Sequence, residues 1–246
     1  MRIAVIADVH GNSLALAAVL AELRGAGADL LVNLGDLVSG PFDPRASAGA
    51  QMALDAATLA GNHERQVLNG GSGALDVLAR ERLDPAHLDW MAGLPPTLSL
   101  ADGEVFACHG SPAGGDDDYL LEDIDAGRTV LAAEAAILPR LAGVGAARLV
   151  LCGHTHTPRV VAVGGVLVVN PGSVGMPAYR AGPPVPHVVE AGAPHARYAV
   201  VERRAGGWAA ELRAVPYDAE AAARQAEALG FAGLAHAART GRLPPA

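Results

Sequence analysis

The chain has 246 residues, of which 51% are hydrophobic and 18% are charged, a composition that excludes disorder over most of its length. Its 18 basic residues are all arginine, and 26 acidic residues bring the formal net charge to −8. This charge argues against a sequence-independent nucleic-acid binder, which needs a basic stripe for the phosphate backbone. Two cysteines, Cys108 and Cys152, are too few for a disulfide scaffold, so we expect a cytoplasmic protein with no membrane association.

The first half of the chain alternates between short apolar runs and helical spacing. Residues 3–7 and 30–34 are apolar runs typical of buried parallel strands, and residues 14–23 between them carry leucine and valine at helical intervals. Helical spacing returns at 73–93, and a further strand is expected at 104–108. This strand–helix–strand opening predicts an open α/β sheet, whose ligands bind beyond the carboxyl ends of the strands.

The second half contains more strands and fewer helices. Two segments rich in Gly, Pro or Asp, 111–127 and 172–195, are expected to be loops, and helical spacing is found at 129–141 and 218–239. Apolar runs that predict strands follow one another closely, at 149–152, 160–163, 166–169, 198–202 and 208–215. The change from alternating elements to consecutive strands predicts two sheets that pack together.

Five polar segments follow predicted strands and bring together side chains that commonly bind metal ions. Any one of them is a weak signal, because Gly-Asp is usually a turn and a lone histidine is often a core residue. All five together, each after an apolar run, make coincidence a poor explanation. Carboxylate, amide and imidazole donors without thiolate suit Mn²⁺, Fe, Zn²⁺ or Ni²⁺ rather than a structural zinc held by cysteines. The segments are Asp8-Val9-His10, Gly35-Asp36, Gly61-Asn62-His63-Glu64, His109 and Gly153-His154-Thr155-His156.

In this order the five segments resemble the calcineurin-like metallophosphoesterase superfamily, whose pattern is D-x-H, G-D, G-N-H-[DE], H and G-H-x-H. The resemblance extends from residue 1 to about residue 174. Within the superfamily, the chain is similar to a bacterial and archaeal branch of small single-domain enzymes. It implies a four-layer α/β/β/α sandwich of two mixed sheets flanked by helices. We expect one domain over residues 1–246, with the motifs within 8–175 and a hairpin and helices at 196–240 that complete the fold.

The resemblance also implies the roles of individual residues. It assigns seven ligands to two divalent ions, Mn²⁺ being preferred: Asp8, His10 and His156 to one ion, Asn62, His109 and His154 to the other, and Asp36 to both. A hydroxide shared by the ions would attack phosphorus directly, and His63 would stabilise charge or give a proton to the leaving oxygen. Asn12 and Arg180 are candidate phosphate contacts, and Arg65 is a weaker one.

One segment departs from the pattern of the protein phosphatases in this superfamily. Their second motif extends to G-D-x-x-D-R-G, in which the second Asp orients the catalytic His and the Arg holds phosphate. Here Ser39 and Gly40 stand at those two positions. The departure disfavours a protein phosphatase and leaves the partner of His63 open, with Asp43 as one candidate.

The sequence therefore favours an enzyme that hydrolyses a small phosphomonoester or phosphodiester. Tyr119 and Tyr179, in the two expected loops, either contact a substrate ring or only cover the edge of the core. The alternatives are a non-catalytic scaffold of the same fold that binds a protein partner, and a nuclease. The scaffold is disfavoured because every ligand and His63 are retained, and the nuclease because no basic groove is expected. The oligomeric state stays open.

Overall fold

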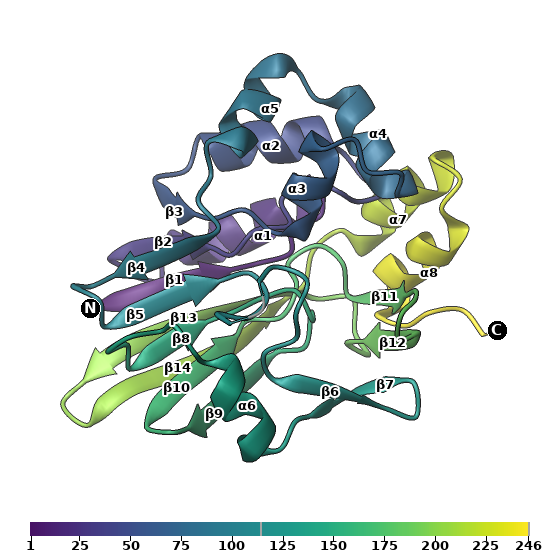
Figure 1. Cartoon of the computed structure of the whole chain (residues 1–246). Coiled ribbons are helices and arrows are strands. Elements are labelled where there is room, and N and C mark those ends of the chain that lie inside the picture. The colour runs from purple at the N-terminus through teal and green to yellow at the C-terminus, as the bar shows by residue number, and fades with distance from the viewer. Residues whose placement is uncertain (114, 246) are drawn as a thin grey trace.

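The computed structural model describes residues 1–113 and 115–245. A five-stranded mixed sheet in the order β14-β13-β1-β2-β3 forms one half of the central sandwich (Figure 1). Strands β1, β2 and β3 are parallel, whereas β13 pairs with β1 in antiparallel orientation. The strands are β1 (Arg2–Ile6), β2 (Leu30–Asn33), β3 (Ala56–Thr58), β13 (Ala196–Arg204) and β14 (Gly207–Val215).

A second five-stranded mixed sheet, in the order β4-β5-β8-β10-β9, forms the other half. Its three central strands are parallel and its two edge strands are antiparallel to their neighbours. The predicted hairpin at 160–169 is present as β9 and β10. The strands are β4 (Thr97–Leu100), β5 (Val105–Cys108), β8 (Leu149–Leu151), β9 (Arg159–Val163) and β10 (Val166–Asn170).

The main hydrophobic core lies between the two sheets. Ile3 and Val5 of β1 pack with Leu149 and Leu151 of β8, and all four are fully buried. Ile6 belongs to a separate core, because successive side chains of a strand point to opposite faces. That outer core includes α1 (Ser13–Leu23), and α6 (Glu134–Arg140) packs on the outer face of the second sheet. The predicted four-layer α/β/β/α sandwich is thus confirmed.

The remaining helices lie around the first sheet. Four of them, α2 to α5, form a group (Figure 1). They share a small apolar core with Leu37 and Val38 of the loop that follows β2. The last two helices pack on each other near the chain's C-terminus. The bounds are α2 (Pro44–Met52), α3 (Asn62–Leu68), α4 (Ala74–Arg82), α5 (Pro85–Ala92), α7 (Ala219–Ala228) and α8 (Ala232–Thr240). No helix in the described part of the chain is long and apolar enough to cross a membrane.

A third, four-stranded sheet, which the sequence analysis does not predict, lies beside the sandwich in the order β11-β12-β7-β6 (Figure 1). Its strands come mostly from the segments 111–127 and 172–195, expected to be loops. It also shortens the helix expected at 129–141, which begins only at Glu134. Acidic and Pro-rich sequences have low strand propensity, so pairing between distant segments decides this region. The strands are β6 (Glu122–Asp125), β7 (Arg128–Leu131), β11 (Ala178–Ala181) and β12 (His187–Glu190).

Candidate metal centre

The predicted ligands meet at one edge of the sandwich. Asp8 and Asp36 follow β1 and β2 of the first sheet, and His109 and His154 follow β5 and β8 of the second. Asn62 is the first residue of α3. Because both sheets present the carboxyl ends of their parallel strands to this edge, residues far apart in sequence become neighbours.

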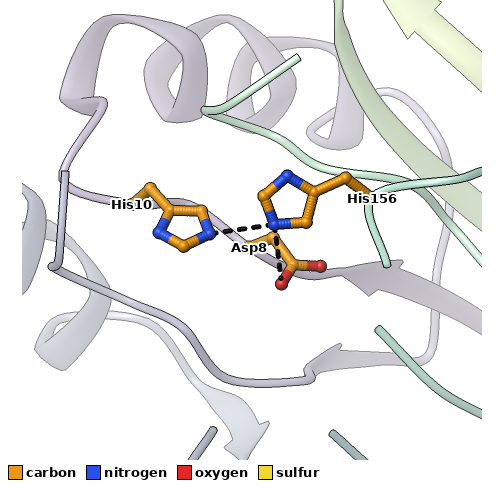
Figure 2. Close-up of side chains that lie close together, drawn as sticks. All are labelled: Asp8, His10 and His156. Atoms are coloured by element: carbon orange, nitrogen blue, oxygen red, sulfur yellow. Dashed lines mark hydrogen bonds and ion pairs between the residues drawn. The ribbon is translucent and has the colours of Figure 1, made fainter. Parts of the chain in front are cut away.

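One group of three predicted ligands consists of Asp8, His10 and His156 (Figure 2). The Nε2 atoms of the two histidines lie 3.0 Å apart, and His156 Nε2 lies 3.4 Å from Asp8 Oδ1. Two nitrogen ligands bound to one ion at about 2.1 Å are separated by about 3 Å, so this spacing fits a shared metal ion. All three side chains are buried.

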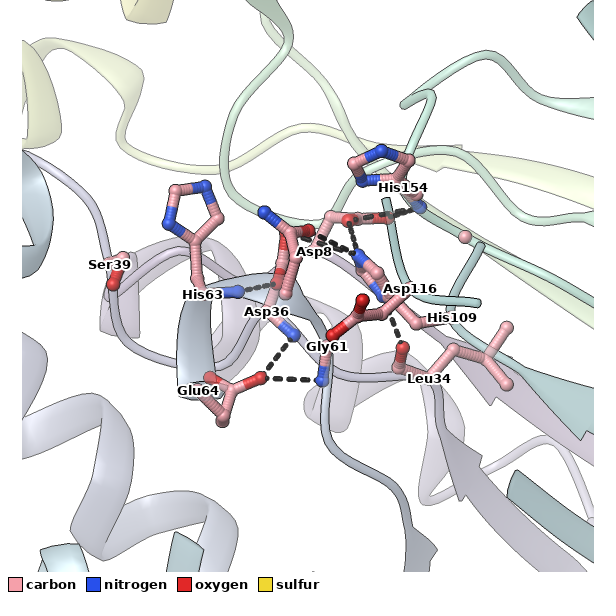
Figure 3. Close-up of polar contacts among 12 residues, drawn as sticks. Asp8, Leu34, Asp36, Ser39, Gly61, His63, Glu64, His109, Asp116 and His154 are labelled. Atoms are coloured by element: carbon pink, nitrogen blue, oxygen red, sulfur yellow. Dashed lines mark hydrogen bonds and ion pairs between the residues drawn. The ribbon is translucent and has the colours of Figure 1, made fainter. Parts of the chain in front are cut away.

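The second group is built around His109 (Figure 3). Its Nε2 lies 3.2 Å from Asp36 Oδ2 and 3.1 Å from Asn62 Oδ1. Ligand atoms of His154, Asp36 and His109 lie within 4.8 Å of one another. Asp36 Oδ2 is also 3.7 Å from His10 Nε2 of the first group, so its carboxylate lies between the two groups.

The backbone at the predicted ligands adopts an unusual conformation. Among the described residues, eight other than glycine have a positive φ, and five of these are predicted ligands. Asp and His tolerate the left-handed region better than most residues, yet each such residue still costs about 1–3 kcal/mol. Strain concentrated at one edge of the sheets is typical of a functional site. The five residues are Asp8, His10, Asp36, His154 and His156, with φ between 49° and 68°.

The predicted histidine ligands are oriented by hydrogen bonds to backbone carbonyl groups. The Nδ1 atoms of His10, His109 and His156 donate to carbonyl oxygens of Ser39, Leu34 and Met176, at 2.6 to 2.8 Å. A carbonyl can only accept, so these bonds place a proton on each Nδ1 and direct each Nε2 into the cluster. Such hydrogen bonds are the usual support of metal-binding histidines.

The two carboxylates of the cluster are ionised. Burial works to raise the pKa of Asp8, but the nearby His156 and His109 bring it below its usual value. Burial likewise opposes ionisation of Asp36, yet His109 and His63 lower its pKa well below the usual value. Two negative charges are therefore held in a buried site, where they attract cations.

The pKa values of the imidazoles in the cluster shift in two directions. Burial and the neighbouring imidazole of His156 lower the pKa of His10 to about 3, and burial and His109 lower that of His154 to about 4. Both are neutral at pH 7 and keep a lone pair for a metal ion. Burial also lowers the pKa of His109, but Asp36 outweighs it and raises the value to about 10. The cluster thus favours a positive charge between its carboxylates.

His63 lies beside the cluster and has its own carboxylate partner. Its Nδ1 donates a hydrogen bond of 2.6 Å to Asp76 Oδ1, from the first turn of α4. Burial lowers the pKa of His63, but Asp36 and Asp76 together raise it to about 9. Asp43, the candidate from sequence, instead caps α2 by accepting from the backbone N–H of Ala46. The partner of His63 is therefore Asp76, which was not among the candidates from sequence.

The departure from the phosphatase motif has a steric cause. A Cβ atom on Gly40 would lie 1.8 Å from the carbonyl oxygen of His10, so an arginine does not fit at this position. The side chain of the fully buried Ser39 has no hydrogen-bond partner among the described residues, and its carbonyl holds His10. The local backbone is thus used to position a predicted ligand rather than to bind phosphate.

Glu64 connects the second and third motifs. Its carboxylate accepts hydrogen bonds from the backbone N–H groups of Asp36 and Gly61, at 2.8 and 2.9 Å (Figure 3). It also accepts one from the backbone N–H of Leu37, at 2.8 Å. It is fully buried. These bonds hold the loop that carries Asp36 against the first turn of α3, which carries Asn62 and His63.

The three candidate phosphate contacts have different environments. The amide of Asn12 caps α1 and donates to Gly175 and Tyr217, and Asn12 is not among the residues that line the cavity at the cluster. Arg65 forms ion pairs with Asp116 and Asp117. Arg180 lines the cavity and is exposed, so it keeps the position expected of a substrate contact.

The cluster forms the floor of a cavity of about 760 Å³. His63 and five of the seven predicted ligands line it, and residues of the third sheet with the segment 117–119 form one wall. The five ligands are His10, Asp36, Asn62, His154 and His156. Its volume falls within the range of pockets for small molecules. The cavity therefore brings a ligand of that size to the ionised carboxylates and neutral imidazoles.

Known proteins are similar to this chain over most of its length. The calcineurin-like phosphoesterase superfamily domain matches residues 1–191. An uncharacterized protein of Methanocaldococcus jannaschii is 26% identical over 201 residues, which are 71% of this chain and 76% of that protein.

Two solved structures share the fold over nearly the whole chain. A metallophosphoesterase from Sphaerobacter thermophilus has a TM-score of 0.74 and 25% identity, and the match covers 98% of this chain and 100% of that one. A hypothetical protein from Pyrococcus horikoshii has a TM-score of 0.76 and 19% identity, with 99% of each chain covered.

Proposed function

The chain belongs to the calcineurin-like phosphoesterase superfamily, and we propose that it hydrolyses a small phosphodiester or phosphomonoester with the help of two divalent metal ions. One observation carries the proposal: two groups of metal-binding side chains share one sheet edge, with the carboxylate of Asp36 between them. This arrangement supports a dinuclear centre, because a carboxylate can bind two ions at once.

Seven residues would hold the ions. Mn²⁺ is the preferred metal, and Fe, Zn²⁺ or Ni²⁺ would also suit these oxygen and nitrogen donors. When bound, such a pair polarises a phosphoryl group and lowers the pKa of a shared water. The ligands in this proposal are Asp8, His10 and His156 for one ion, Asn62, His109 and His154 for the other, and Asp36 for both.

The cavity supports attack by water rather than by a serine, threonine or cysteine of the protein. No Ser, Thr or Cys is found among the described residues that line it. Cys108 and Cys152, next to predicted ligands, are buried, and burial raises the pKa of both thiols. Both thiols therefore stay protonated and are poor nucleophiles. We accordingly expect hydrolysis without a covalent phospho-enzyme.

His63 would act as the acid that gives a proton to the leaving oxygen. It lines the cavity, and its Nδ1–H is held by Asp76, which leaves Nε2 for the substrate. A histidine held by a carboxylate keeps a fixed ring orientation, as in other acid–base pairs of enzymes. Arg180 at the cavity is the proposed phosphate contact.

The test is hydrolysis of p-nitrophenyl phosphate and bis(p-nitrophenyl) phosphate by the full chain, with Mn²⁺ and after chelation. We expect turnover of at least one ester with Mn²⁺ and none without metal. A screen of nucleotides, cyclic nucleotides and phospholipid head-group diesters would then identify the preferred ester. Absence of metal-dependent hydrolysis of every ester would overturn the proposal and favour a non-catalytic scaffold that binds a protein partner.

A further inference from the structure

Two tyrosine rings on one side of the cavity pack against predicted ligands. The ring of Tyr119 packs edge-on against His154, with centroids 5.1 Å apart, and the ring of Tyr179 packs in the same way against His156, at 4.7 Å. Together with His187, which contacts both rings, we call these residues the tyrosine wall. All three line the cavity.

The N–H and O–H donors of the tyrosine wall form hydrogen bonds within the protein. His187 Nδ1 donates to the carbonyl oxygen of Val185 at 2.7 Å, and in the neutral ring Nε2 is then an acceptor. The hydroxyl of Tyr119, 2.9 Å from that Nε2, is then the donor to it. Tyr119 therefore accepts from the hydroxyl of Tyr179, also at 2.9 Å. Every polar hydrogen of the wall has a partner inside the protein, so the wall offers mainly carbon surface to a ligand.

Apolar side chains continue this surface around the cavity. Leu75 comes from α4, Ile124 from β6, Met176 from the segment before β11, and Val185 from the turn before β12. Val185 is 51% exposed, so its side chain is open to a ligand in the cavity. These residues belong to four separate segments, and all of them face the same cavity.

Charges at the cavity offer no second site for an anion. Among the described lining residues, Arg180 is the one arginine, and Asp117 and Asp118 are both exposed. Arg65 nearby is already paired with Asp116 and Asp117. A substrate with several phosphate groups would therefore meet more carboxylates than guanidinium groups outside the metal centre.

We infer that the part of the cavity lined by the tyrosine wall, Ile124 and Val185 binds the organic group of the substrate, an uncharged ring or other apolar group that carries a single phosphoryl group. The inference rests on the proposed function, because it places the phosphoryl group at the metal centre. The cavity of about 760 Å³ is much larger than one phosphate requires.

The test measures binding rather than turnover, with phosphonates that cannot be hydrolysed. Calorimetry on the Mn²⁺-loaded protein compares methylphosphonate, benzylphosphonate and 4-carboxybenzylphosphonate. We expect benzylphosphonate to bind at least about tenfold more tightly than methylphosphonate, since part of a ring leaves water. The added carboxylate should cancel most of this gain. Equal binding of the first two, or tightest binding of the carboxylated compound, would overturn the inference.

A pair of matched variants locates the subsite. Val185→Arg adds a cation to the apolar part of the cavity, whereas Val160→Arg makes the same change at a similarly exposed valine of β9 that does not line it. We expect Val185→Arg to remove most of the benzyl preference and to strengthen binding of the carboxylated compound by about fivefold or more. Val160→Arg should match the wild type. If the relative affinities of the three phosphonates are unchanged in Val185→Arg, the location of the apolar subsite is wrong.

Binding of methylphosphonate distinguishes failure of the inferred substrate class from failure of the proposed function. If it binds the Mn²⁺-loaded protein without any preference for a ring, the substrate class is wrong and the proposed function stands. If no phosphonate binds the metal-loaded protein, the proposed function and the inference that rests on it both fail.

Discussion

The two sides of the cavity are built in different ways. One side carries the predicted metal ligands, mostly buried residues that follow β1, β2, β5 and β8, and three of its imidazoles are fixed by backbone carbonyls. The opposite side comes from the third sheet and the turn before β12, where Ile124 and Tyr179 line the cavity beside the exposed Val185. From this difference we expect the sandwich to fix the predicted ligands, and the less buried third sheet to influence which molecules enter.

The largest effect is expected from the residue between the two metal-binding groups. Asp36→Ala should abolish binding of both ions and lower turnover by more than about 10³-fold, because it removes a buried carboxylate that two groups of ligands share. Metal content by mass spectrometry and turnover of a nitrophenyl ester check this. Asp55→Ala, at an exposed aspartate, is the control. Two ions retained in Asp36→Ala would refute the bridging role.

His63 tests whether acid and ligand roles are separate. His63→Ala should keep both ions and lower kcat by about 10²- to 10⁴-fold, the usual contribution of a positioned acid. His236→Ala, at a half-buried histidine of α8, should change neither. Because His63 also lies near ligand atoms of His10 and Asp36, loss of an ion in His63→Ala would instead make it a ligand.

Asp76 should act through His63. Asp76→Asn keeps the shape of the side chain but removes the charge at the 2.6 Å hydrogen bond, and we expect kcat to fall about 10- to 100-fold with little change in KM. The loss should be larger for esters with poor leaving groups, which depend on the acid. Steady-state kinetics on phenyl and nitrophenyl esters check this, and thermal unfolding controls for the start of α4. An equal loss for both esters would indicate a purely structural role.

The smallest effect on catalysis is expected at Asn12. Its amide caps α1 and contacts Gly175 and Tyr217, so Asn12→Ala should lower the free energy of unfolding by about 1–2 kcal/mol. Denaturant unfolding measures this change. The KM of the active protein should stay within about twofold, and a large rise in KM without loss of stability would restore the phosphate contact predicted from sequence.

The sandwich and the positions of the predicted ligands follow from local patterns. Apolar runs such as 3–7 predict buried strands, and parallel strands place their carboxyl ends together, so Asp8 and His154 could be expected at one edge. The left-handed backbone at these residues leaves no comparable pattern in the sequence.

The third sheet and the partner of His63 could not be predicted in this way. β6 has the sequence EDID, which has little strand propensity, and pairs with β7 in a separate sheet that includes β12. Asp76 is one of many helix acids, 13 residues from His63, and only the packing of α4 on α3 makes it a partner. Contacts of this kind depend on tertiary structure rather than on spacing.

The most direct test of the central claim is a titration of the metal-free chain with Mn²⁺, in which bound metal and hydrolysis of a nitrophenyl ester are followed in the same sample. We predict two bound ions per chain and a turnover rate that rises as the second ion binds. Two bound ions without hydrolysis of the monoester or the diester would contradict the enzymatic function. Hydrolysis that persists in the metal-free chain would contradict the role of the metal centre.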